Sequence, residues 1–181
     1  MTFATLPDAT YFSDNRQFKL EITFEKIAMF TQRPTYTFSD TISNTTLWSF
    51  CPDLKGIRTD WESLVLVPVN ATISDEGWTL VSTYHCAGSS VIGFSPEGEM
   101  LFQHNLDKHL ERENGYKGCT NHRGVMSLGK ALIYFTNLNK KRVVCIRTWW
   151  RTICIIEMET GNFIDGSLSD AVLSYERELI S

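Results

Sequence analysis

The stretch that decides the fold is Ile73-Ser74-Asp75-Glu76-Gly77-Trp78-Thr79-Leu80-Val81-Ser82-Thr83-Tyr84. It opens with a Ser-Asp-Glu-Gly turn, in which glycine can take a positive φ without a Cβ clash. The β-branched and aromatic residues that follow are typical of a strand. A second apolar strand at 90–94 runs into a Ser-Pro-Glu-Gly turn, and a third resumes at 99–102. These segments predict a three-stranded antiparallel meander over residues 72–103.

The same order of turn and strand recurs near the N-terminus. The turn is Ser13-Asp14-Asn15-Arg16, and Asn15 is predicted to stand where Gly77 stands in the middle copy. Residues 18–24 then alternate apolar and polar side chains, which predicts a strand with one apolar face. Further predicted segments are strands at 26–30 and 45–50, and a long polar hairpin loop at 31–44.

A third, more divergent copy occupies the C-terminal part of the chain. Strands are predicted at 131–136, 142–148 and 153–158, followed by a turn at Glu159-Thr160-Gly161-Asn162. A unit of this size that recurs along a chain indicates a repeat architecture. The sequence therefore predicts one β-rich domain over residues 1–181, with repeated units at about 10–50, 72–103 and 130–165.

Two short helices are expected among these strands. Asn105 can cap a helix over residues 106–113, and the polar residues 114–123 after it indicate a loop. Ser169 can cap a C-terminal helix at about 169–180, with Val172, Leu173 and Leu179 on its apolar side. The predicted fold class is all-β, mainly antiparallel, with one short internal helix and one C-terminal helix.

Two motifs carry a resemblance to a known architecture. They are Ser74-Asp75-Glu76-Gly77 and Ile92-Gly93-Phe94-Ser95-Pro96-Glu97-Gly98-Glu99-Met100, joined by a C-terminal strand pair that ends in Glu-Thr-Gly. The chain resembles blades of a β-propeller and, more narrowly, bacterial blade-repeat proteins to which no activity is assigned. Complete propellers have four or more blades. The resemblance implies a partial propeller, an open stack of sheets, or one half of a dimeric ring.

Composition excludes several classes of function. The net charge is −4 and the pI about 5.6, so no overall basic field draws the protein to nucleic acid or to an anionic membrane. No apolar run approaches the roughly 18 residues of a membrane helix. The N-terminus has no signal-peptide core. We therefore expect a cytoplasmic protein that does not bind membranes, and we do not expect it to bind nucleic acid.

The cysteines are odd in number and have no framework spacing. They are Cys51, Cys86, Cys119, Cys145 and Cys154. Reduced thiols in a cytoplasm are the simplest interpretation. Cys145 and Cys154 lie inside apolar strands, where cysteine behaves as a small buried hydrophobe.

One spacing could support a metal. Cys119 and His122 form a Cys-x-x-His pair that, together with His85 and Cys86, could bind zinc through thiolate and imidazole ligands. Adjacent residues of a strand point to opposite faces, so only one of His85 and Cys86 would reach a common site easily. The alternative is a loop cysteine beside a surface histidine, and no cofactor is the favoured prediction.

A cysteine nucleophile is a further possibility. Small residues surround Cys86 and could open a pocket, and His104, His109 or His122 could act as its base. No sequence feature brings a base to Cys86, and no residue is singled out as catalytic.

The segment Arg147-Thr148-Trp149-Trp150-Arg151 is the strongest candidate for a binding surface. Tryptophan beside arginine is the composition of protein-interface hot spots. Neighbouring residues of a strand face opposite sides, so one of Trp149 and Trp150 is expected near the surface. The alternative is a core tryptophan with the other packed beneath an arginine stem.

These observations favour a non-enzymatic protein-binding module whose partner is another protein or a second copy of the chain. One alternative is a metal- or cysteine-dependent enzyme that uses Cys119 and His122. Another is a bacterial immunity or antitoxin-type protein, which fits the size and acidity of the chain.

Overall fold

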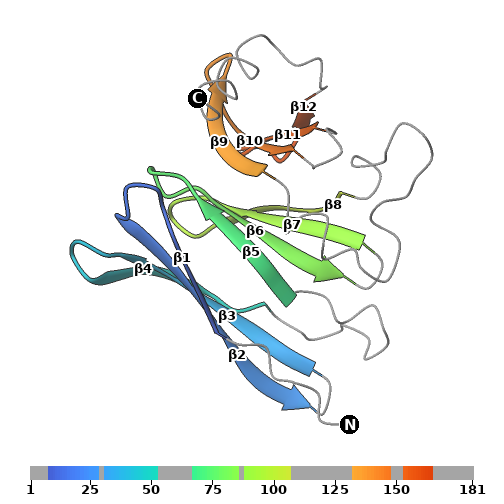
Figure 1. The fold of residues 1–181 in the computed structure, drawn as a ribbon. Coiled ribbons are helices and arrows are strands. Elements are labelled where there is room, and N and C mark those ends of the chain that lie inside the picture. The colour runs from blue at the N-terminus through green and yellow to red at the C-terminus, as the bar shows by residue number, and fades with distance from the viewer. Residues whose placement is uncertain are drawn as a thin grey trace.

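The computed structural model describes residues 8–28, 31–52, 67–85, 88–106, 132–147 and 153–164. These residues form twelve β-strands in three four-stranded antiparallel sheets, and they contain no helix. Within each sheet, strands that are consecutive in the sequence pair with each other, so each sheet is a meander. Figure 1 shows the three sheets stacked in chain order, from blue to red. The all-β, mainly antiparallel prediction is confirmed.

The N-terminal sheet contains β1 (Ala9–Phe12), β2 (Phe18–Ala28), β3 (Thr31–Asp40) and β4 (Thr45–Phe50). The middle sheet contains β5 (Val67–Ile73), β6 (Thr79–His85), β7 (Gly88–Phe94) and β8 (Met100–Asn105). The C-terminal sheet contains β9 (Leu132–Leu138), β10 (Lys141–Arg147), β11 (Ile153–Glu157) and β12 (Phe163–Ile164).

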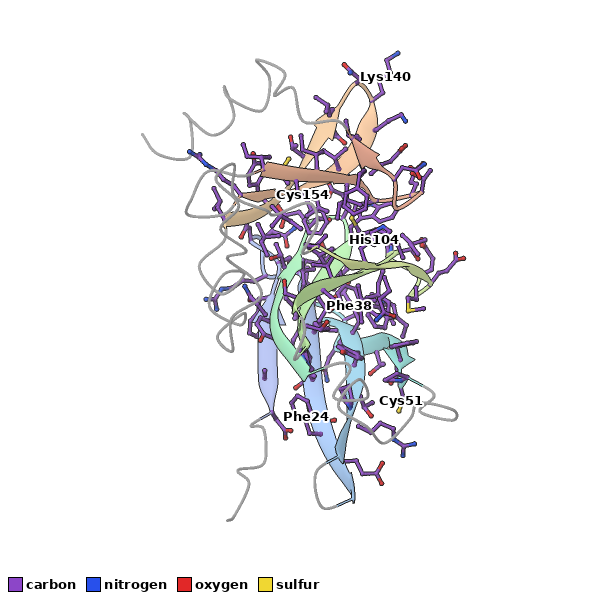
Figure 2. All side chains as sticks on the ribbon, turned by 90° about the vertical axis from the view of Figure 1, so that its right-hand side faces the viewer. Phe24, Phe38, Cys51, His104, Lys140 and Cys154 are labelled. Atoms are coloured by element: carbon purple, nitrogen blue, oxygen red, sulfur yellow. The ribbon has the colours of Figure 1, made fainter. Side chains whose placement is uncertain are left out.

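The middle sheet is buried on both faces. Side chains alternate along its strands, so Val81 faces the N-terminal sheet while Leu80 faces the C-terminal sheet. The core between the N-terminal and middle sheets comprises Leu20, Ile22, Tyr36, Phe38, Trp48, Ile73, Val81, Ile92 and Phe94. The core between the middle and C-terminal sheets comprises Leu80, Val91, Phe102, Leu106, Val144, Ile146, Cys154, Ile156 and Met158. Figure 2 shows Phe38 and His104 at these two levels of the stack.

One turn design recurs at the hairpins. Ser13, Ser74 and Ser95 each open a turn. In each turn the serine carbonyl oxygen accepts a hydrogen bond from the backbone N–H of the residue three positions later, at 2.9–3.0 Å. The serine hydroxyl oxygen also accepts a backbone N–H at 3.0–3.3 Å. The third residue has a positive φ: 59° for Arg16, 92° for Gly77 and 88° for Gly98.

The N-terminal turn therefore differs from the prediction. Arg16, not Asn15, stands at the position of Gly77. The Asn15 side-chain oxygen instead accepts hydrogen bonds from the Ser13 hydroxyl and the Gln17 N–H, both at 2.8 Å. The turn also closes on the fifth residue after its serine, where the middle copy closes on the fourth. The extra residue follows Arg16, so the first four positions of the two turns align without a gap.

A bulge recurs at one position in the last strand of two sheets. In β4, Leu47 has no partner because Phe38 pairs with Trp48 and Ser39 with Thr46. In β8, Leu101 is skipped in the same way. Each bulged residue stands three positions after the left-handed residue of its turn. The N-terminal and middle sheets thus share turn, bulge and topology, which supports the predicted internal repeat.

Several strand predictions were wrong. Residues 26–28 do not begin a separate strand, because β2 continues through Ala28, and β1 at Ala9–Phe12 was not predicted. Residues 31–44 are not a hairpin loop, because β3 spans Thr31–Asp40. Tyr36 and Phe38 alternate there with threonines, and both aromatic side chains are fully buried. The middle meander has four strands instead of three, since β5 begins at Val67.

The two predicted helices are not confirmed. Asn105, the expected helix cap, is instead the last residue of β8. Residues 107–113 and the C-terminal helix at 169–180 lie outside the described residues. Nowhere in the described ranges is there a helix long and apolar enough to cross a membrane.

Candidate binding surface

Most of the predicted site residues lie outside the described ranges. This applies to Trp149, Trp150, Arg151, Cys119, His122 and Cys86. Arg147 is the last residue of β10, opposite Leu132 of β9 and Ile153 of β11. The backbone of His85 forms the last position of β6. The described part of the chain contains no group of three or more His, Cys, Asp or Glu residues that could hold a metal ion.

The cysteines of the C-terminal sheet are core residues, as predicted. Cys145 and Cys154 are both buried and lie in adjacent strands. Their register places them on opposite faces, because Cys145 pairs with Ile155 and Cys154 with Ile146. Burial raises the pKa of the Cys154 thiol to about 12, with a smaller contribution from Cys145. Cys154 is therefore a poor nucleophile at neutral pH.

His104 packs between the middle and C-terminal sheets. Its Nε2 lies 2.7 Å from the carbonyl oxygen of Gly161 in the turn between β11 and β12. Its ring stacks on Phe102 at 5.0 Å between centroids and lies 4.7 Å from Phe163. One ring nitrogen of this candidate base is thus engaged in joining two sheets (Figure 2).

A second kind of contact joins the sheets at their turns. A Cβ at Gly98 would lie 2.5 Å from Cγ of Trp48 in the preceding sheet. A Cβ at Gly161 would lie 2.7 Å from the Cβ of Phe102. Trp48 and Phe102 both follow the bulge in the last strand of their sheets. The same glycine-on-aromatic contact therefore links the first sheet to the second and the second to the third.

Polar groups connect the turns at the same end of the stack. The Asn15 N–H donates to the Asp75 carboxylate at 2.9 Å, and Arg142 pairs with Glu76 at 2.9 Å. Burial opposes ionisation of Glu76, but a hydrogen bond with Ser74 and the charge of Arg142 outweigh it and lower the pKa of Glu76. The first contact joins the turns of the first two sheets, and the second joins the β5–β6 turn to β10 of the third sheet.

The two ends of the stack differ in polarity. On the outer face of the N-terminal sheet, Lys19 and Glu21 form an ion pair at 2.9 Å among threonines. The outer face of the C-terminal sheet carries an apolar row across all four strands: Tyr134, Cys145, Ile155 and Ile164. Arg147 lies on this same face by strand alternation.

Among the described strands, β4 is the most exposed. Thr45, Thr46, Leu47 and Ser49 are exposed, and only Trp48 is buried. Among the described strands β4 pairs with β3 alone, so its outer edge has no strand beside it. The opposite edge strand, β1, packs against β5 of the middle sheet.

Two exposed apolar side chains flank this edge. Leu47, the bulged residue, is 47% exposed. Met100, at the start of β8, is 45% exposed and lies two residues after Gly98, which rests on Trp48. Sequence reasoning identified the β4 strand but not this surface. The signal was the run Thr-Thr-Leu-Trp-Ser-Phe, which has high strand propensity and no charged residue.

No protein-family model matches the chain, and no curated protein matches it in sequence.

Proposed function

We propose that the protein is a non-enzymatic protein-binding module that docks its partner along the open edge of β4. The observation that carries this proposal is the exposure of an uncharged edge strand, with four of its six side chains exposed. An edge strand presents unpaired N–H and C=O groups, which an extended segment of another protein can satisfy by adding a strand.

Features that normally protect an edge are scarce along β4. Proteins block strand addition with charged side chains, proline, bulges or covering segments. β4 has no charge and no proline, and its bulge leaves Leu47 exposed. β5, an edge of the middle sheet, carries Pro68. Leu47 and Met100 add apolar area that a partner segment would bury.

The scaffold in this proposal is an open stack of three propeller-blade-like meanders, similar to bacterial blade-repeat proteins. The outer face of the N-terminal sheet makes it unfavourable for the stack of sheets to close into a propeller ring. At positions where the middle sheet has Val81 and Ile92, the equivalent residues of the N-terminal sheet are Glu21 and Thr37. A polar face of this kind does not pack dry against another blade. A cytoplasmic location in a bacterium belongs to the same proposal. The bacterial origin rests on the resemblance, and the cytoplasmic location rests on cysteines that are odd in number and have no framework spacing.

The segment Arg147-Thr148-Trp149-Trp150-Arg151 is proposed as a second contact region. Arg147 lies on the apolar outer face of the C-terminal sheet, opposite Leu132, which is 42% exposed. Tyr134, Cys145 and Ile155 on this face are buried, so a partner would meet Arg147 and the exposed Leu132 at the end of the strands.

Affinity capture with matched variants tests the β4 surface. A tagged wild-type chain, expressed beside an untagged copy in the native host, should retain one protein in stoichiometric amount. Thr46→Lys/Ser49→Lys should lose it, whereas Thr10→Lys/Thr23→Lys should retain it. The control adds the same charges to exposed positions of the same face, away from the β4 edge. Equal capture by both variants would exclude β4, and no stoichiometric protein at all would exclude the binding function.

A further inference from the structure

We infer that the segment docked on β4 is β4 of a second copy of the chain, paired antiparallel across a two-fold axis. This inference rests on the proposed function and names its partner. Two N-terminal sheets of four strands would join into one continuous sheet, in the order β1-β2-β3-β4 and then β4-β3-β2-β1 of the partner.

The absence of charge along β4 favours pairing with itself. In an isologous contact each strand meets its own sequence, so a charge near the axis lies close to its copy and repels it. Residues 45–50 contain no ionisable side chain. A dedicated partner strand would instead be selected by charges on β4 that complement its own.

The exposure pattern also distinguishes β4 from the edge strands β9 and β1. β9 is likewise uncharged, but its exposed residues, Leu132 and Asn137, lie near its two ends. β1 alternates partly buried with exposed residues and packs against β5. In β4 the exposure extends along the strand and is interrupted only by Trp48.

A two-fold axis perpendicular to the joined sheet preserves its two faces. The polar outer face of one copy would continue into the polar outer face of the other, and the apolar inner faces would remain covered by the two middle sheets. Met100 starts the edge strand β8 of the middle sheet and pairs with Phe94, which faces the N-terminal sheet. Leu47 and Met100 of both copies would therefore gather beside the axis, where their exposed apolar area is removed from water.

The bulge at Leu47 provides a clean way to test this pairing. Because of it, Thr46 and Ser49 oppose Ser39 and Thr37, so both lie on the polar outer face. Substituting them leaves the buried inner face unchanged. In an antiparallel pair centred between residues 47 and 48, Thr46 of one copy lies opposite Ser49 of the other.

The experiment is charge complementation, read by native mass spectrometry and by light scattering across a range of concentrations. The wild type should form a dimer. Thr46→Lys/Ser49→Lys and Thr46→Glu/Ser49→Glu should each raise the dimer dissociation constant roughly tenfold or more, because like charges meet across the axis. An equimolar mixture of the two variants should restore a heterodimer. Thr10→Lys/Thr23→Lys should dimerise as the wild type does.

Several results would overturn the inference. They are a wild type that stays monomeric at every concentration, a lysine variant that dimerises unchanged, or a mixture that stays monomeric while both variants retain the wild-type circular dichroism spectrum. If a variant fails to fold, hydrogen exchange on the wild type decides: β4 amides should gain protection as concentration rises, and β1 amides should not. A monomeric wild type that still captures a different protein through β4 would overturn self-pairing and leave the proposed function standing.

Discussion

At the scale of the residue, three serines organise the hairpin turns. Ser13, Ser74 and Ser95 each use the backbone carbonyl and the hydroxyl oxygen to accept N–H groups that the turn would otherwise leave unpaired. Each turn also needs a left-handed residue, and Arg16 fills this position in the first copy. A side chain at a positive φ is tolerated there because the serine hydrogen bonds hold the turn closed.

Glu157 gives a prediction on pH at the residue scale. Its carboxylate accepts hydrogen bonds from Lys141 and Thr160, each at 3.0 Å. The bond from Lys141 is the main cause of the lowered pKa of Glu157. A pKa lower in the folded than in the unfolded state means that the ionised group adds stability above the unfolded value of about 4.3. This contribution is lost as the pH falls through the lower, folded pKa.

Urea unfolding of the wild type and Glu157→Gln across the acid range checks this. The wild type should be the more stable protein near neutral pH, and the difference should shrink as the pH falls below about 4.3. Lys141→Met should also weaken the dependence of stability on pH, because it removes the main cause of the lowered Glu157 pKa. A difference between wild type and Glu157→Gln that is constant with pH would contradict the assignment.

At the scale of the element, the contact between a turn and the preceding sheet sets the spacing of the stack. Gly98 has a φ of 88°, and the ring of Trp48 occupies the space where its Cβ would lie. Gly161 has the same relation to Phe102. The turns can approach these aromatic rings only because they carry glycine there.

Gly98→Ala should therefore destabilise the protein by about 2–5 kcal/mol. A left-handed alanine costs roughly 1–2 kcal/mol, and overpacking against Trp48 adds about 1–3 kcal/mol. Urea unfolding followed by circular dichroism measures the change. Glu97→Ala, at an exposed position of the same turn as Gly98, is the control and should change stability by less than about 0.5 kcal/mol. A Gly98→Ala protein as stable as this control would show that the turn can move away from Trp48 without cost.

At the scale of the whole molecule, the middle sheet couples the other two. Its two faces contribute to both cores, so removing either neighbour exposes buried apolar residues of the middle sheet. Cooperative unfolding follows when neighbouring elements depend on a shared buried surface. We expect the three sheets to unfold in one transition.

Thiol labelling during urea unfolding, mapped by mass spectrometry, tests this cooperativity. In the native state Cys51, which is exposed, should react with an alkylating reagent, whereas Cys145 and Cys154 should be protected. Both buried thiols should become reactive in the transition that circular dichroism detects. Reaction of either at lower urea would show that the C-terminal sheet separates from the stack first.

The sequence alone was sufficient for the all-β class and for the turns of the middle sheet, because these depend on near neighbours. Side-chain alternation marked β2, and Ser-x-x-Gly turns marked the hairpins of the middle sheet. β3 escaped prediction because its threonines make it polar in composition, although Tyr36 and Phe38 carry the alternation. The burial of both faces of the middle sheet and the exposure of β4 were decided only by the tertiary structure. An edge strand and a central strand have the same local pattern, and what distinguishes them is whether a distant part of the chain supplies a second partner.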